Sequence, residues 1–268
     1  SNDFDGIIGG EAYDQKVKEI PGFMEMQQVV GDLVEKMGKE LRSQDPCKTI
    51  QIFEIGVGTG ITTMHILDSL QGSVYIEGVE IEPKMIDTFK TKTSYCSRYS
   101  IIKESPFSFI ENKVSPCRSR IVTVHRDSAN YFLYHNLQRN IDNKTLYVVD
   151  AVVSAATIHN ICSKVRDKLF YDIKHKLRPE GIFIMADKIA VDDYAQHIND
   201  LAAELKLLDD LPEDLRQSWL EHYAFDEQPG IKLTESDLEK TLANTGFTDI
   251  KKVWRQGLNA VYTATKPK

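Results

Sequence analysis

Apolar residues occur at two spacings along the chain, and each spacing predicts a different element. Residues 12–44 carry them at helical spacing, with an interruption at Pro21-Gly22. Further along, short apolar runs alternate with amphipathic stretches, which predicts βαβ units and a parallel sheet. The predicted strands are 49–56, 73–80, 120–127, 145–154 and 181–187. The predicted helices between them are 61–70, 83–92, 128–139 and 156–177.

The pattern changes after the last of these strands. Residues 190–224 predict two helices and no strand, and a capping-box-like start at Thr234 predicts a helix that ends at Gly246. Two apolar runs, 248–255 and 259–266, close the chain. Only Gln256-Gly257-Leu258 separates them. So short a connection forces a hairpin, which places an antiparallel strand in the sheet.

These elements predict an α/β fold: a doubly wound, Rossmann-like sheet of seven strands with an antiparallel last strand, plus a helical lid and N-terminal helices. We expect residues 1–44 to form a helical cap. Residues 45–189 and 233–268 form the sheet domain, and residues 190–232 are a lid inserted into it.

Composition limits the class of partner. The 268 residues contain no apolar run near the roughly 20 residues that cross a membrane, and no signal-peptide pattern. The four cysteines form no CxxC pair, so we expect reduced thiols and a cytoplasmic location. A net charge of −7 disfavours nucleic acid as a partner. One cluster is either a local RNA-facing patch or a solvated face: Lys84, Lys90, Lys92, Arg98 and Lys103.

The first candidate for ligand binding is the segment FEIGVGTG, where Gly56, Gly58 and Gly60 follow the first strand. Glycine lets the backbone turn tightly and approach a ligand without a Cβ in the way. The spacing does not meet the GxGxxG pattern of dinucleotide-binding folds. Glu54, inside the same segment, would repel a pyrophosphate and attract an ammonium.

Two further acids end neighbouring strands. Glu80 ends the second strand, where a carboxylate can accept both hydroxyls of a ribose. Glu82 is nearby, but strand alternation directs it to the opposite face. Asp127, with Ser128, ends the third strand, where it can accept from an adenine amino group. An ammonium, a ribose and an adenine without phosphates describe S-adenosylmethionine.

Five segments, in this order, resemble the motifs of class I S-adenosylmethionine-dependent methyltransferases: FEIGVGTG, GVEIEPKMI, HRDSA, DAVVSAATIHNI and LRPEGIFIMAD. The resemblance covers about residues 45–266. It implies that Glu54 and the turn glycines hold the methionine end, that Glu80 binds the ribose, and that Asp127 with Ser128 meets the adenine. It also implies that Asp150, ending the fourth strand, faces the amino group or the transferred methyl.

A shorter segment, KEIPGF, is similar to the (R)xxPGY segment of the carboxy-S-adenosylmethionine synthases of tRNA wobble-uridine modification. Lys18 stands where that subgroup has Arg, and Phe23 where it has Tyr. The resemblance implies that a helix before the sheet domain closes over the cofactor, with Tyr13 against it.

Two histidines are candidates for a general base because an imidazole titrates near neutral pH. His159 follows the fourth strand, where it either serves the acceptor or caps and packs. His222 lies in the lid beside Trp219 and Tyr223, an aromatic cluster that either roofs the acceptor or packs in the ordinary way. No spacing of His, Asp and Glu indicates a metal site.

The sequence therefore predicts a methyltransferase that uses S-adenosyl-L-methionine and acts on a small molecule by in-line transfer. Three alternatives stay open: a tRNA-modification enzyme of the carboxy-S-adenosylmethionine type, a catalytically silent cofactor-binding protein and, more remotely, a nicotinamide oxidoreductase. A membrane partner is not expected, and a homodimer is left open.

Overall fold

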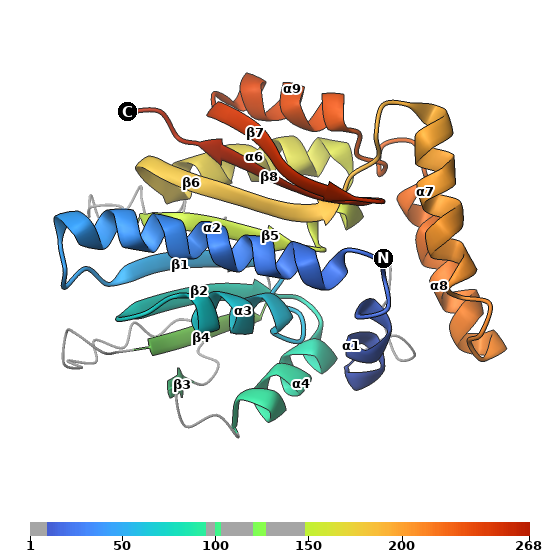
Figure 1. Cartoon of the computed structure of the whole chain (residues 1–268), viewed down its shortest axis with the longest axis horizontal. Coiled ribbons are helices and arrows are strands. Elements are labelled where there is room, and N and C mark those ends of the chain that lie inside the picture. The colour runs from blue at the N-terminus through green and yellow to red at the C-terminus, as the bar shows by residue number, and fades with distance from the viewer. Residues whose placement is uncertain (1–9, 95–99, 103–119, 127–147) are drawn as a thin grey trace.

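The computed structural model describes residues 10–94, 100–102, 120–126 and 148–268. Its strands form one mixed sheet (Figure 1) in the order β3-β4-β2-β1-β5-β6-β8-β7. The strands are β1 (Ile50–Ile55), β2 (Val74–Glu80), β3 (Ser100–Ile102), β4 (Arg120–Arg126), β5 (Val149–Ala155), β6 (Leu177–Lys188), β7 (Thr248–Gln256) and β8 (Asn259–Thr265). The helices are α1 (Glu11–Val17), α2 (Phe23–Gln44), α3 (Ile61–Ser69), α4 (Pro83–Ser94), α6 (Ser163–Lys176), α7 (Tyr194–Lys206), α8 (Glu213–Asp226) and α9 (Glu235–Thr245).

The predicted Rossmann-like α/β fold is confirmed, but the predicted strand number is wrong. The described sheet has eight strands, not seven, because the short β3 pairs in parallel with β4 at the edge. At the other side, β8 runs antiparallel to both β6 and β7. The chain runs outward from β1 to β2 and β4, and then returns to β5 and β6 on the other side of β1. The strand order therefore switches between β1 and β5, which is where ligands bind in such sheets.

Helices cover both faces of the sheet (Figure 1). Successive residues of β1 face opposite sides, so Ile50 and Ile52 join one apolar cluster while Phe53 and Ile55 join the other. The first cluster includes the buried side of α2 and residues of α3. The second includes residues of α6 and α9. Burial on both faces explains why the central strands are almost continuously apolar.

The interruption before α2 has a steric cause. Gly22 has a φ of 80°, and a Cβ there would lie 2.8 Å from the ring of Trp254. Glycine therefore fits both the left-handed backbone and the close approach. Because the first helical segment stops here, α1 is a separate short helix (Figure 1), placed beside α4 and α8 at one end of the sheet.

One expected helix is divided. The stretch predicted as a helix over 156–177 contains a 3₁₀ turn, η1 (Ile158–Asn160), followed by α6. The helix predicted over 128–139 lies outside the described residues. Among the helices that the structure describes, none has the length and apolarity to cross a membrane.

The lid segment, residues 190–232, contains α7 and α8 and is held at its base by backbone contacts. The Ala190 N–H donates to the Leu233 carbonyl at 2.8 Å, and the Glu235 N–H donates to the Ala190 carbonyl at 3.0 Å. The chain therefore leaves the sheet and returns to it at adjacent positions. The two helices lie at the same end of the molecule as α1 (Figure 1).

Candidate functional site

The glycine turn after β1 approaches two other elements closely. A Cβ at Gly56 would lie 2.0 Å from the Thr157 Oγ1, just after β5, and a Cβ at Gly60 would lie 2.0 Å from the ring of Phe89 in α4. A Cβ at Gly58 would meet nothing within 4 Å. The turn is therefore tightly packed at both ends and open in the middle, as a ligand-binding turn requires.

Glu54 lies under this turn and is 1% exposed. Its Oε2 accepts a hydrogen bond from the Thr63 hydroxyl at 2.7 Å, while its Oε1 is buried without a hydrogen-bond partner. Burial raises the pKa of Glu54 to about 8; the Thr63 hydroxyl opposes the rise and the charge of Glu80 adds to it. An ammonium placed against Oε1 would favour the charged carboxylate.

Glu80, the last residue of β2, contacts the turn. Its Oε2 accepts from the Gly58 N–H at 2.7 Å, and its Oε1 accepts from the backbone N–H groups of Ile81 and Glu82, both at 2.8 Å. Burial raises the pKa of Glu80, although these three backbone donors oppose the rise. The carboxylate predicted for the ribose is therefore directly connected to the central glycine.

The short helix α1 covers the same turn. The Thr59 hydroxyl donates to the Asp14 Oδ1, and the Asp14 Oδ2 forms an ion pair with the Lys92 ammonium from α4. Lys92 also donates to the Thr59 carbonyl at 3.2 Å. The neighbouring Tyr13 stacks on Trp219 of the lid, with ring centroids 6.4 Å apart. Lys92, one of the basic residues expected to face solvent or RNA, is instead bound at the glycine turn.

Tyr13 also shows how the site extends across the sheet. Burial raises its pKa, and the charges of Asp187 and Glu80 raise it further. Glu80 ends β2 and Asp187 lies near the end of β6, on opposite sides of β1. Carboxylates on both sides of β1 thus act on the Tyr13 hydroxyl.

The imidazole of His159 is fixed by Asp187. The ring Nδ1 forms a short contact with the Asp187 Oδ1, and the Asp187 Oδ2 accepts from the backbone N–H groups of Ile158 at 2.8 Å and His159 at 3.3 Å. The other ring nitrogen, Nε2, is buried without a hydrogen-bond partner. A carboxylate on Nδ1 selects the tautomer that leaves Nε2 able to accept a proton.

The lid brings His222 and Asp226 to this imidazole. The rings of His159 and His222 lie edge to face with centroids 5.8 Å apart. The Asp226 Oδ2 lies 4.0 Å from the His159 Nε2 and 3.6 Å from the His222 Nε2. Both histidines predicted from the sequence therefore meet in one cluster.

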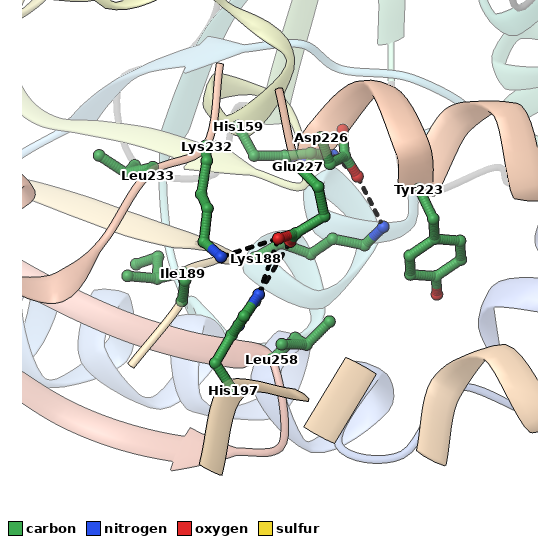
Figure 2. Close-up of a pocket in the computed structure, with 11 residues that line it drawn as sticks. His159, Lys188, Ile189, His197, Tyr223, Asp226, Glu227, Lys232, Leu233 and Leu258 are labelled. Carbon is green, nitrogen blue, oxygen red and sulfur yellow. Dashed lines mark hydrogen bonds and ion pairs between the residues drawn. The ribbon is translucent and has the colours of Figure 1, made fainter. Parts of the chain in front are cut away.

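Lys188 supplies the positive charge of the cluster. Its ammonium donates to the Asp226 Oδ2 at 3.0 Å and lies 3.7 Å from the centre of the Tyr223 ring (Figure 2). Burial lowers the pKa of His222 to about 3, and the Lys188 charge adds to this effect. Burial acts to raise the pKa of Asp226, but the facing imidazole of His159 and the ammonium of Lys188 outweigh this effect, and the pKa is lowered. His222 is therefore a neutral neighbour, and Lys188 with Asp226 forms the charged pair.

A small pocket of about 30 Å³ adjoins the cluster, enough for about one or two water molecules. His159, Lys188 and Asp226 line one part of it. Figure 2 shows His197 and Lys232 both directed at Glu227, with contacts of 2.9 and 2.7 Å to its Oε2. Polar side chains from β6, α7 and the end of α8 thus surround this pocket.

Three of these side chains lie close enough together to hold a metal ion, which the sequence spacing did not predict. Ligand atoms of His159, His222 and Asp226 lie within 4.8 Å of one another. The carboxylate on the His159 Nδ1 is the usual outer partner of a metal-bound imidazole. A divalent cation here would compete with the Lys188 ammonium for the same Asp226 oxygen.

Asp150 corrects one expectation. It lies near the start of β5, not at its end, so it belongs to the edge of the sheet opposite the glycine turn. Its Oδ1 accepts from the Arg178 Nε at 2.8 Å and pairs with Lys48 at 3.1 Å, while its Oδ2 accepts from the Gln51 N–H. The acid is a structural ion-pair partner because β5 continues to Ala155, and its carboxyl end carries Thr157 and His159 instead.

Not every predicted residue can be placed. Asp127 and Ser128, predicted to meet the adenine, lie outside the described residues. Lys18, in the segment that is similar to the carboxy-S-adenosylmethionine synthases, is exposed just after α1. Phe23 is buried in the core.

The sequence reasoning assigned no role to four charged residues: Asp14, Asp187, Lys188 and Asp226. For Asp187 a signal was present, since it ends the apolar run GIFIMAD at the same edge as the other strand-end acids. Asp226 stands one helical turn after His222, which is a spacing that brings side chains together. Asp14 and Lys188 carried no such signal because their partners are distant in sequence.

No protein-family model and no curated protein matches the sequence. Solved structures with a similar fold include the CurJ carbon methyltransferase, with a TM-score of 0.60, 15% identity and coverage of 96% of this chain and 58% of that one. An O-methyltransferase family protein from Burkholderia thailandensis gives a TM-score of 0.56, 11% identity and coverage of 96% and 60%. The DszA carbon methyltransferase gives a TM-score of 0.52 and 16% identity, with coverage of 88% of this chain and 53% of that one.

At these identities the similarity shows the fold alone. The chain also spans less than two thirds of the length of each of these three proteins.

Proposed function

We propose that this chain is an S-adenosylmethionine-dependent methyltransferase that acts on a small molecule. The observation that carries the proposal is the shared edge of the sheet. There the Gly58–Glu80 contact lies on one side of β1 and the buried His159–Asp187 pair lies on the other. The proteins of similar fold, two carbon methyltransferases and an O-methyltransferase family protein, support the same reaction class.

In this proposal the turn and its acids hold the cofactor. Gly56, Gly58 and Gly60 let the backbone approach it, Glu54 faces its ammonium, and Glu80 exchanges the Gly58 N–H for the ribose hydroxyls. Asp127 and Ser128 are proposed for the adenine. The sulfonium is already activated, so the protein contributes mainly alignment and exclusion of water.

The acceptor would lie between His159 and the lid, and the bound cofactor would supply the methyl group for in-line transfer. The His159 Nε2 takes the acceptor's proton, and Asp187 stabilises the resulting imidazolium through Nδ1. His222, neutral beside Lys188, contributes shape and one hydrogen bond. Lys188 stabilises negative charge that develops on the acceptor as its proton leaves.

Calorimetry with S-adenosylmethionine, S-adenosylhomocysteine and NAD tests the cofactor. We expect both sulfur ligands to bind and NAD not to bind. Replacing Glu80 by Gln should weaken binding by about 1.5–3 kcal/mol for one charged hydrogen bond lost. The matched control is Glu82→Gln, which should leave the affinity unchanged. Binding of NAD alone would overturn the proposal.

Mass spectrometry of ligand retained during purification separates the alternatives. A carboxylated form of the cofactor would favour the carboxy-S-adenosylmethionine type. Incubation with labelled cofactor and a panel of phenols, alcohols, amines and 1,3-dicarbonyl compounds should transfer label to one class. Cofactor binding without transfer to any of them would favour the catalytically silent alternative.

A further inference from the structure

Asp14 and Lys92 form an ion pair that the proposed reaction does not use. Asp14 comes from α1 and is 6% exposed, and Lys92 comes from α4 with a side chain that is 33% exposed. Thr59, inside the glycine turn, contacts both: its hydroxyl donates to Asp14 and its carbonyl accepts from Lys92. The pair is therefore fixed at the turn itself.

The chemistry of the pair selects one part of the proposed cofactor. The ribose and the adenine are uncharged, whereas the amino acid end carries an ammonium and a carboxylate side by side. The Asp14 carboxylate and the Lys92 ammonium already face each other, and together they are complementary in charge to this zwitterion. When the zwitterion binds, Asp14 and Lys92 each exchange the other for a group of opposite charge on the ligand, so the local net charge stays the same. Neither side chain is left as an isolated charge, which would cost free energy in a partly buried site.

The surroundings also favour a ligand over a purely structural bond. The buried Oε1 of Glu54 lies under the same turn without a hydrogen-bond partner, so one acceptor for an ammonium is already present. A Cβ at Gly58 would meet nothing within 4 Å, which leaves space beside Thr59. Tyr13, next to Asp14, stacks on Trp219, so the helix that carries Asp14 is held at the turn.

We propose that Asp14 and Lys92 recognise the amino acid end of the cofactor, Asp14 through its ammonium and Lys92 through its carboxylate. This inference rests on the proposed function, because it requires a sulfur cofactor at the glycine turn. It makes α1 a part of the binding site, and the ion pair with Lys92 is the arrangement that the zwitterion replaces.

The anchoring of α1 allows the charge to be changed without detaching the helix. Lys16 donates to the Leu207 carbonyl at 2.7 Å, and Tyr13 stacks on Trp219. Val17 is buried in the core. Asp14→Asn keeps the size of the side chain and an oxygen that can accept from Thr59, so the variant tests the charge.

Three ligands separate the groups. S-adenosylhomocysteine carries both charges of the amino acid end, decarboxylated S-adenosylmethionine lacks the carboxylate, and methylthioadenosine lacks the amino acid end but keeps the ribose, adenine and sulfur. Calorimetry should show Asp14→Asn weakening the first two ligands tenfold or more and methylthioadenosine less than twofold. Lys92→Met should weaken only S-adenosylhomocysteine by a similar factor.

The controls are Asp32→Asn, an exposed acid of α2, and Lys90→Met, a half-exposed lysine of α4. Both should leave all three affinities unchanged. Equal loss of S-adenosylhomocysteine and methylthioadenosine in Asp14→Asn would show that the pair only fastens α1, and unchanged affinities would show no role; either overturns this inference. Failure of the wild-type protein to bind any of the three ligands would overturn the proposed function instead.

Discussion

Tyr13 and Trp219 stack with nearly parallel rings, 9° apart, although one belongs to the first helix and the other to the lid. Trp219 also contacts the rings of His222 and Tyr223, with centroids 6.2 and 6.4 Å away. The helix that covers the glycine turn and the helix that carries the acceptor-side residues therefore share one aromatic cluster. In the proposed enzyme, this one aromatic cluster covers both the cofactor and the acceptor.

Trp219→Ala should therefore affect the cofactor although Trp219 belongs to the lid. Loss of the stacked pair removes about 0.5–1.5 kcal/mol of support for Tyr13. We expect S-adenosylhomocysteine to bind several-fold more weakly by calorimetry. Trp254→Ala is the matched control, since Trp254 packs near Gly22 and belongs to β7, at the edge of the sheet and not next to β1. Unchanged cofactor affinity in Trp219→Ala would mean that the two helices act independently.

His159→Gln should lower turnover by about 10²–10⁴, the usual contribution of a general base, and leave cofactor affinity intact. Asp187→Asn should lower kcat with little change in the KM of the acceptor, because Asp187 positions the imidazole without touching the acceptor. Steady-state kinetics with the acceptor from the labelling panel measures both. Full activity of His159→Gln would show that the acceptor needs no base.

Glu54 predicts a proton linked to cofactor binding. With a pKa of about 8, its carboxyl is largely protonated at pH 7 in the free protein. An arriving ammonium stabilises the carboxylate, so binding should release a proton. Calorimetry at pH 7 in two buffers of different ionisation enthalpy should show this release, and Glu54→Gln should abolish it. Identical enthalpies in both buffers for the wild type would place the ammonium elsewhere.

The same group affects stability with a defined sign. Its pKa is raised in the folded protein from the ordinary 4.5, so the folded state binds more protons between these values. The stability that it contributes is fully present below about pH 4.5 and is lost as pH rises through about 8. Denaturation midpoints of Glu54→Gln should therefore fall less than those of the wild type over this range. A Glu82→Gln control should follow the wild type.

Asp150→Asn tests the corrected assignment. We expect it to lower the free energy of unfolding by about 3 kcal/mol, because Lys48 and Arg178 lose their buried partner. Cofactor affinity should not change, since the residue lies at the opposite edge of the sheet. Urea titration and calorimetry measure the two effects. Asp249→Asn is the control; its exposed pair with Lys251 should contribute at most about 1 kcal/mol.

The sequence predicted the parts of the site that depend on local pattern. Strand ends followed by glycine or acid indicated the turn and Glu80, and the position after the fourth strand indicated His159 as a candidate. Asp150 was misplaced because its role came from the family resemblance, although the strand predicted over 145–154 already continued past it. The eighth strand escaped because β3 is too short to show a period.

The partners of these residues could not be predicted, because they depend on how distant segments pack. Nothing local in the sequence connects Asp14 with Lys92 or Lys188 with Asp226, yet these contacts decide which side chains are charged. His222 illustrates the result: it lies where the sequence placed it, but burial and Lys188 make it a poor base. The sequence located the chemical groups, and the folded structure determined the burial and the charges that surround them.

The closed base of residues 190–232 has an evolutionary consequence. Since the chain departs from the sheet at Ala190 and rejoins it at Leu233, this stretch can be lengthened, shortened or exchanged as one contiguous piece without altering strand order. His159 and Asp187 stay behind on the sheet, while Trp219, His222 and Asp226 travel with the exchanged piece. In the proposed enzyme, new acceptors would therefore be accessible by exchanging this single segment, while His159, Asp187 and the glycine turn stay in place.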